Sequence, residues 1–207
     1  MSTDKYITGS CIIYKGTIKK DGANVYEWEG DVLAFLLSAY RHFEFNYPKF
    51  YKMDNLSKLG WLAAEILLKD SFRKDDYKPE EVAVVLTNAN SSLDNDLKYA
   101  DSMKDIASPS LFVYTLPNIV IGEICIRNHF KGEQAFFIQD AFDAGFLEKN
   151  VSYLLDKNLA EACICGWVDV FDQEYRAALF LVEKEKNEKS VLFSAKNMND
   201  IFIKFNN

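Results

Sequence analysis

Two spacings of apolar residues alternate along this chain of 207 residues. Continuous apolar runs bounded by polar turns are typical of strands buried on both faces. They occur at residues 6–14, 82–87, 135–139, 161–166 and 177–183. Apolar residues that recur every three or four positions predict helices. We place them at residues 31–40, 54–67 and 143–155. This alternation predicts an α/β fold in which a mostly parallel sheet lies between helices, a three-layer α/β/α arrangement.

Polar and turn-forming residues mark the ends of these elements. Asp54 is placed to cap the helix that follows it, Pro117-Asn118 opens a further helix, and Lys131-Gly132 ends that helix. Residues 183–189 mix both signs of charge between two apolar strands, which predicts a solvated hairpin turn. We therefore expect one domain over residues 1–207, with a core at about 6–183 and a C-terminal hairpin at 184–207.

The composition excludes several classes of partner. The chain is 49% hydrophobic and 27% charged, as in globular proteins, and its net charge is -7. An acidic protein lacks the attraction that drives binding to nucleic acid or to anionic membranes, and it also repels an acidic acyl carrier protein. We find no basic leader and no run of about 20 apolar residues that would make a membrane helix. The sequence thus predicts a cytoplasmic protein.

Cysteine and histidine usage favours neither disulfides nor a metal site. The four cysteines are irregularly spaced and have apolar neighbours, as is typical of buried reduced thiols. They are Cys11, Cys125, Cys163 and Cys165. The last two share one face of a predicted strand, but His42 and His129 lie far from them in sequence and show no ligand spacing. We expect no metal and no cofactor.

Residues 108–132 contain, in order, Ser-Pro, Leu-Pro-Asn, Gly, Ile-Arg and Lys-Gly. This order resembles the segment of the β-ketoacyl-acyl-carrier-protein synthases that leads to the strand before the nucleophile. Residues 7–13 are similar to the first strand of that family, residues 163–169 to the strand that closes its first half with a glycine turn, and residues 177–183 to the next strand. The resemblance runs from about residue 6 to 183 and implies one half of a thiolase-like condensing-enzyme fold.

The resemblance also implies where the catalytic cysteine would lie, namely on the turn after residues 135–139. A thiolate there is stabilised by the N-terminus of the following helix. Counting back from Gly166 places Ala141 at this position, whereas alignment of Ala144-Gly145 places Phe142 there. Neither residue can attack a thioester. The family's two catalytic histidines come from a second half that this chain does not contain, so we expect no catalytic residues.

Other departures point the same way. The polar loop at residues 88–92 replaces family glycines, and its asparagines are expected to adopt the left-handed backbone that such a loop needs. Gln139 invites comparison with the glutamine that replaces cysteine in chain length factors, although it falls two or three positions early. Chain length factors are subunits without the cysteine that pair with an active synthase.

Three functions remain open at this point. The first is a noncatalytic, chain-length-factor-like subunit that assists an active 3-oxoacyl-ACP synthase in fatty-acid, polyketide, aryl-polyene or flexirubin-type biosynthesis. The second is a free-standing acyl- or aryl-chain binding protein that uses apolar space behind Phe136, Phe137 and Phe142. The third is an acyltransferase that uses Cys163 or Cys165.

The expected partner is a second copy of the chain or a full-length synthase, with an acyl carrier protein as a further possibility. In the resembled family, the strand before the nucleophile pairs with its counterpart across a two-fold axis. This implies a candidate acyl pocket or dimer interface at the predicted strand and the Pro117 turn. Its residues are Leu116, Pro117, Asn118, Phe136, Phe137, Ile138 and Gln139.

Overall fold

A single mixed sheet forms the centre of the computed structural model, which describes residues 4–203. Its order is β3-β2-β1-β7-β6-β4-β5, and β8 pairs with β1. The strands are β1 (Tyr6–Tyr14), β2 (Thr17–Lys20), β3 (Ala23–Glu27), β4 (Val82–Asn88), β5 (Gln134–Ile138), β6 (Ala162–Phe171), β7 (Glu174–Glu183) and β8 (Val191–Leu192). The strands predicted at residues 82–87 and 135–139 therefore lie in one sheet, as expected.

The expectation of a mostly parallel sheet is wrong. Strand β4 runs parallel to β5 and β6, but every other pair of strands is antiparallel. The reason is local, because β6 ends at Phe171 and β7 begins at Glu174. A connection of two residues can join antiparallel neighbours, whereas parallel neighbours need a long crossover. Asp172 takes the left-handed backbone that this tight turn requires, with φ 55°.

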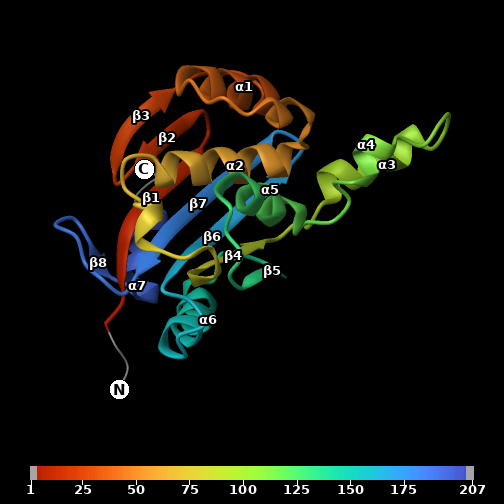
Figure 1. Ribbon diagram of the computed structural model, residues 1–207. Helices are drawn as coiled ribbons and strands as arrows, with labels where there is room; N and C mark the ends of the chain where they lie inside the picture. Colours follow the sequence, from red (N-terminus) through yellow and green to blue (C-terminus); the bar gives the residue numbers. More distant parts are fainter. Residues whose placement is uncertain (1–3, 204–207) are drawn as a thin grey trace.

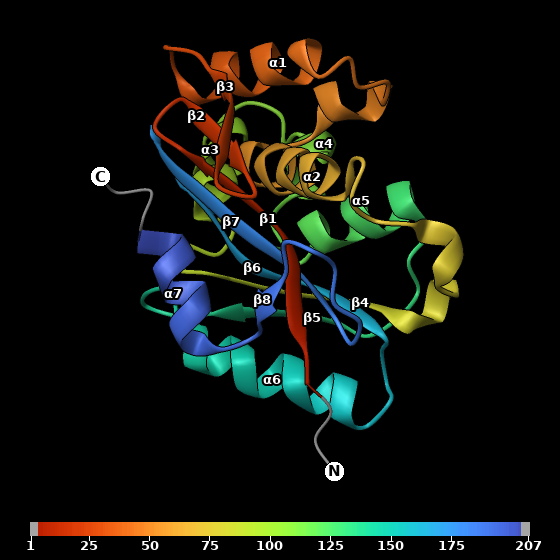
Figure 2. The same ribbon diagram turned by 90° about the vertical axis from the view of Figure 1, so that its left-hand side faces the viewer.

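Helices cover both faces of the sheet, which confirms the three-layer α/β/α prediction. Figure 1 and Figure 2 show α1, α2 and α5 on one face and α6 and α7 on the other. The α-helices are α1 (Val32–His42), α2 (Asn55–Leu68), α3 (Leu93–Ser102), α4 (Pro109–Phe112), α5 (Ile119–Asn128), α6 (Ala144–Asp156) and α7 (Ala195–Ile203). Short 3₁₀ helices occupy Pro48–Lys52, Lys74–Asp76 and Pro79–Glu81. Among residues 4–203, no helix has both the length and the hydropathy needed to cross a membrane.

Helix α2 is the central element of the first layer and begins where the sequence predicted. The Asp54 carboxylate accepts a hydrogen bond from the Ser57 amide at 3.0 Å, as an N-cap does. Nearly every side chain of α2 is buried against the sheet, α1 and α5. Burial raises the pKa of Asp54, because desolvation outweighs the hydrogen bonds from Ser57 and the nearby charge of Lys58.

The raised pKa of Asp54 predicts a pH-dependent effect of substitution. A carboxyl whose pKa is raised by folding stabilises the protein fully below its unfolded pKa, and this contribution is lost as pH rises through the folded pKa. Asp54→Asn keeps a good N-cap without the charge. The free energy of unfolding of this variant, relative to that of the wild type, should therefore increase as the pH rises from acid to neutral. Urea titrations across that range measure the difference. Asp54→Ala, which removes the cap, should lose about 1 kcal/mol, and an Asp54→Asn difference independent of pH would contradict the prediction.

The C-terminal segment is not the predicted hairpin. Strand β7 already has β1 and β6 as neighbours, so it has no free edge for a returning strand. The chain instead passes to the other side of β1, where β8 pairs with Tyr6 and Ile7, and then forms α7. Helix α7 packs against α6; its Met198 is buried, as is Phe193 just before it. Residues 204–207 of the predicted hairpin lie outside the described residues.

Gly166 lies inside β6 and not at a turn, contrary to what the resemblance implied. Its φ is 149°, and a Cβ atom added there would lie 1.9 Å from the carbonyl oxygen of Ala178 on β7. Glycine therefore allows β6 and β7 to approach each other closely at this point.

Helices α3 and α4 form an arm that projects from the end of β4 away from the sheet (Figure 1). The loop before it contains the left-handed residue that the sequence predicted, but this residue is Ser91 (φ 52°) and not an asparagine. The Asn88 side chain instead holds the turn. It donates to the Ser91 carbonyl at 2.8 Å and accepts from the Ser91 amide at 3.0 Å.

Candidate functional site

The turn between β5 and α6 lies where the resemblance places the nucleophile, between a strand and the N-terminus of a helix. The Gln139 amide donates to the Asn88 carbonyl at 2.8 Å, which ends β5 beside β4. The Asp143 carboxylate then accepts from the Phe146 amide at 2.9 Å and caps α6. Residues 139–145 and Asn199 of α7 line an open surface depression of about 450 Å³. None of residues 139–143 has a positive φ, so the backbone of the turn is unstrained.

Both candidates for the nucleophile position lie on this turn, but they differ in exposure. Ala141 is exposed, whereas Phe142 turns inward. The Phe142 ring stacks on the ring of Phe202 at a centroid distance of 4.1 Å and also contacts Phe180. Phe202 belongs to α7 and is held by the guanidinium of Arg176, which lies 3.4 Å from its ring centroid and donates to its carbonyl oxygen. An aromatic stack thus fills the space next to the turn.

The thiols offer no substitute nucleophile. All four cysteines are free and buried. Cys163 and Cys165 do share one face of β6, as the sequence predicted, and that face lies in the core under α6. Desolvation raises the pKa of both thiols far above the ordinary value and raises the pKa of Cys125 to about 11. A thiol is nucleophilic as the thiolate, so burial suppresses the reactivity that an acyltransferase would require.

The protein alone is therefore expected to form no covalent adduct with an acyl-thioester donor. Intact-mass spectrometry after incubation with the donor should show the unmodified mass, because no thiol is both accessible and ionised. Ala141→Cys is the matched control, since it places an exposed thiol just before the N-terminus of α6. This variant should react. A stoichiometric adduct on Cys163 or Cys165 of the wild type would contradict the prediction.

Neither histidine belongs to a reactive cluster. His42 ends α1 and packs on Tyr26 at a centroid distance of 4.6 Å. His129 is the C-cap of α5, with a left-handed backbone (φ 59°), and lines a cavity of about 270 Å³. Among the described residues, no group of three His, Cys, Asp or Glu side chains could hold a metal ion.

The predicted interface residues of β5 lie on an edge strand, because β5 pairs with β4 alone. Their side chains differ in direction. Phe136 packs on the layer that contains α2 and α5, whereas Phe137 makes an edge contact of 4.9 Å with Phe146 of α6. Ile138 is 52% exposed. The free surface of this edge is therefore the β5 backbone together with Ile138.

The other predicted interface residues lie at the base of the arm. Leu116 is 59% exposed, Asn118 is exposed, and Pro117 is half-buried ahead of α5. The neighbouring Tyr114 anchors this turn, because its hydroxyl donates to the buried carboxylate of Glu123 at 3.2 Å. Lys49 pairs with the same carboxylate at 2.8 Å. Burial and the Glu123 charge raise the pKa of Tyr114 well above its ordinary value.

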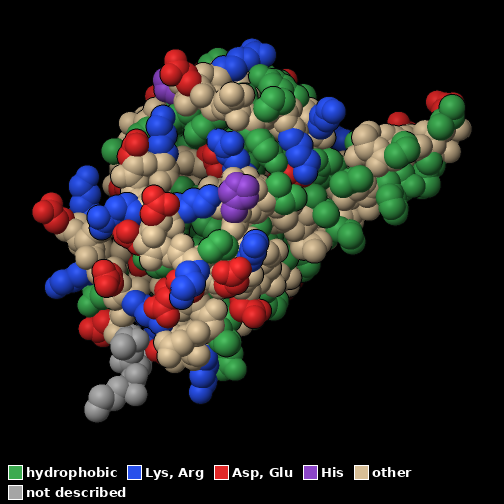
Figure 3. Space-filling model, viewed as in Figure 1, with side chains coloured by type: hydrophobic (Ala, Val, Ile, Leu, Met, Phe, Trp, Pro, Cys, Tyr) green, Lys and Arg blue, Asp and Glu red, His purple; other side chains and the backbone are tan. Residues whose placement is uncertain are grey.

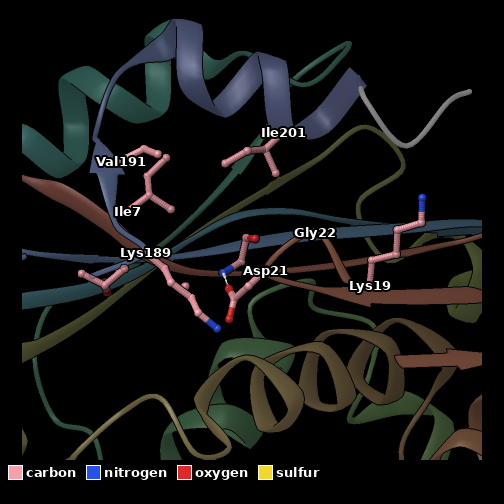
Figure 4. Close-up of a pocket in the computed structure, with 10 residues that line it drawn as sticks. Ile7, Lys19, Asp21, Gly22, Lys189, Val191 and Ile201 are labelled. Carbon is pink, nitrogen blue, oxygen red and sulfur yellow. Dashed lines mark hydrogen bonds between the residues drawn. The ribbon is translucent and has the colours of Figure 1, made fainter. Parts of the chain in front are cut away.

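A separate cavity of about 530 Å³ lies where β1 changes partner from β8 to β2 (Figure 4). Ile7, Val191 and Ile201 line its apolar side below α7, and Lys189 extends toward Asp21 on the other side. Asp21 accepts from the Ser10 amide at 2.7 Å. The volume of this cavity is in the range of small-molecule sites.

Two features of the site had no clear signal in the sequence. The first is the contact between α7 and Phe142, which depends on Phe202 and Phe142 lying side by side in the fold. The second is the apolar surface of the arm formed by α3 and α4, which depends on which of its side chains are exposed in the fold. An apolar residue on a short helix looks the same in sequence whether it is buried or exposed, so periodicity alone could not have identified either feature.

No family model matches the chain, and no curated protein matches its sequence. Solved structures do match it. A structure described as the ishigamide ketosynthase/chain length factor matches with a TM-score of 0.63 at 18% identity, over 87% of this chain and 62% of that chain. AntDE, described as a type II polyketide ketosynthase in complex with its acyl-carrier protein AntF, matches with a TM-score of 0.63 at 16% identity, over 88% of this chain and 63% of that chain.

A third match comes from the ketosynthase ApeO in complex with its chain length factor ApeC from Xenorhabdus doucetiae. Its TM-score is 0.56 at 12% identity, over 89% of this chain and 80% of that chain. The chain thus spans less than two thirds of the length of the first two matches. With the sheet, the two helical layers and the strand–turn–helix at β5 and α6, these likenesses show that the chain has the thiolase-like α/β fold of ketosynthases and chain length factors.

Proposed function

We propose that this chain is a noncatalytic, chain-length-factor-like subunit that assists an active 3-oxoacyl-ACP synthase. The observation that carries the proposal is Phe142. It lies on the turn that would hold the nucleophile and is stacked under Phe202 on a ketosynthase-type fold. A protein that keeps this fold without reactive groups is suited to pairing with a catalytic relative.

The free edge of β5 supports pairing as the mode of action. Unpaired backbone groups on an edge strand are a template for strand addition, and proteins normally cover or block such an edge. Here the edge ends in the exposed Ile138, with no proline or charged residue between Gln134 and Ile138 to block it. A partner strand would satisfy these groups, and an obligate interface of this kind buries about 2,000 Å² or more in total.

Co-expression with the full-length synthase encoded nearest to this chain tests the proposal. A stable complex is expected by size-exclusion light scattering. Ile138→Lys should weaken it by about 30-fold or more, because a charge placed in an apolar contact must be desolvated. Leu159→Lys is the matched control: Leu159 is also exposed but lies before β6, at the opposite end of the strands. The absence of a complex, or equal effects of the two variants, would reject the proposal.

A free-standing acyl-chain binding protein is the second candidate, and the cavity of about 530 Å³ favours it. The apolar space was first expected behind Phe136, Phe137 and Phe142. Phe136 packs on the layer of α2 and α5, whereas Phe146 packs on Phe137 and Phe202 packs on Phe142. The cavity beside Ile7 and Ile201 would be the acyl site instead. Micromolar binding of a fluorescent fatty acid by the chain alone, without any synthase complex, would favour this candidate over the first.

A further inference from the structure

Strand β1 has a break in the pairing along one of its edges, and a cleft opens at this break. Strand β8 pairs with residues 6–7 of β1 and β2 pairs with residues 11–14, so residues 8–10 have no strand on this side. The cavity of about 530 Å³ in Figure 4 lies here, and an open depression of about 540 Å³ adjoins it. Both are lined by Thr8, Asp21 and Lys189. Together they form the β1 cleft, which is large enough for a small molecule.

Two residues of opposite charge line the β1 cleft and are tied to β1 by hydrogen bonds. The Ser10 amide donates to Asp21 Oδ1 at 2.7 Å, and the Asp21 amide donates back to the Ser10 carbonyl at 2.9 Å. The Lys189 amide donates to the side-chain oxygen of Asn187 at 3.0 Å, and the Asn187 side chain donates to the Thr8 carbonyl at 3.0 Å. Residues held in position before a ligand arrives lose less entropy when it binds.

The charges of Asp21 and Lys189 are available to a ligand. Lys189 extends toward Asp21, yet within residues 4–203 neither side chain belongs to an ion pair (Figure 4). The contact with Ser10 uses only one carboxylate oxygen of Asp21. An ammonium group beside Asp21 and a carboxylate beside Lys189 would make charge-assisted hydrogen bonds to both. This pair of groups is the zwitterionic head of an amino acid.

The wall of the β1 cleft opposite these charges is apolar. Val191 lies directly across from Ile7 in the pairing of β8 with β1, and Ile201 of α7 completes this apolar wall (Figure 4). Val191 is 42% exposed although its side chain is aliphatic. An apolar group of a ligand would remove this surface from water, which is favourable.

We propose that the β1 cleft binds a small apolar α-amino acid. The ammonium group of the ligand pairs with Asp21, its carboxylate pairs with Lys189, and its side chain packs on the apolar wall. A fatty acid would use Lys189 and the same wall, but it would bring its carboxylate close to that of Asp21, which is unfavourable. The site goes beyond the proposed function and does not depend on it, because β7, β6 and β4 separate β1 from the β5 edge.

Isothermal titration calorimetry of the purified chain with L-phenylalanine and L-leucine tests the site. Binding is expected with a dissociation constant on the order of 0.1 mM. Hydrocinnamate lacks the ammonium group and phenethylamine lacks the carboxylate, so each should bind about 10-fold more weakly than L-phenylalanine. No binding of either amino acid would overturn the proposal. Equal or tighter binding of hydrocinnamate would also overturn it and would favour the acyl-chain candidate.

Substitutions then locate the two contacts. Lys189→Gln and Asp21→Asn should each weaken L-phenylalanine binding by about 5-fold, and asparagine keeps an acceptor for the Ser10 amide. The matched controls are Lys186→Gln in the same loop and Asp172→Asn, since Asp172 shares the left-handed backbone of Asp21 (φ 55° and 49°). All four positions are exposed, so the variants should fold. Binding that is unchanged by Lys189→Gln and Asp21→Asn, or weakened equally by the controls, would overturn the site. Both substitutions should leave a synthase complex intact, so failure of either proposal is recognised separately.

Discussion

Gly166→Ala is expected to lower the free energy of unfolding by about 4 kcal/mol, a large part of the stability of a domain of this size. The added Cβ would lie 1.9 Å from the Ala178 carbonyl oxygen, a backbone atom that cannot rotate away. The φ of 149° is also one that alanine rarely adopts. Since β6 lies between β4 and β7, relief of this clash would separate strands at the centre of the sheet.

Urea denaturation followed by circular dichroism measures this loss. Gly22→Ala is the matched control, because Gly22 also has a positive φ (82°) but no atom lies within 4 Å of its added Cβ. It should cost about 1 kcal/mol from backbone strain alone. If both variants lost similar stability, the close approach of β6 and β7 would not be the cause.

Met198→Asp is expected to release α7 and cost at least about 4 kcal/mol. Met198 is fully buried between α7 and the α6 side of the sheet, so the substitution removes its packing and places a charge in an apolar core. Release of α7 would also remove Phe202 from the ring of Phe142. The turn after β5 should then become open to solvent.

Two measurements separate these effects. Thermal unfolding reports the stability, and alkylation of a cysteine placed at residue 142 reports access to the turn. Phe142→Cys should react slowly alone and faster when combined with Met198→Asp. Ile203→Asp, which is on α7 but 53% exposed, is the control and should change neither quantity by much. Equal alkylation rates with and without Met198→Asp would show that α7 does not cover the turn.

The sequence predicted those parts of the fold that depend on local chemistry. The strand at residues 82–87 was recognisable because its first five residues are all apolar, as expected of an element buried on both faces, and the structure extends it to Asn88. Helix α2 was recognisable because Asp54 and the apolar spacing agree on where it begins. The candidate interface at residues 116–118 and 136–139 stays a prediction, and the structure adds that Leu116, Asn118 and Ile138 are its exposed members.

Features that depend on long-range partners could not be predicted in the same way. A strand in a continuous apolar run carries no mark of its direction, so the antiparallel pairing of β7 with β1 and β6 was not visible. The strand β8 is two residues long, below the length at which a pattern can be recognised. Phe142 could be named as a candidate position, but its partner Phe202 comes 60 residues later and follows from the position of α7.

The pairing of β1 with β7 also has a consequence for biosynthesis. Tyr6 lies opposite Glu183, so β1 leaves the ribosome well before β7, and the middle of the sheet cannot close until β7 has been synthesised. At roughly 5–20 residues per second, this delay is many seconds for the nascent chain. Long-range strand pairing is intrinsically slow to form. Closure of the sheet is therefore expected only after β7 has left the ribosome, with the apolar strands β1 and β4 in need of chaperone protection until then.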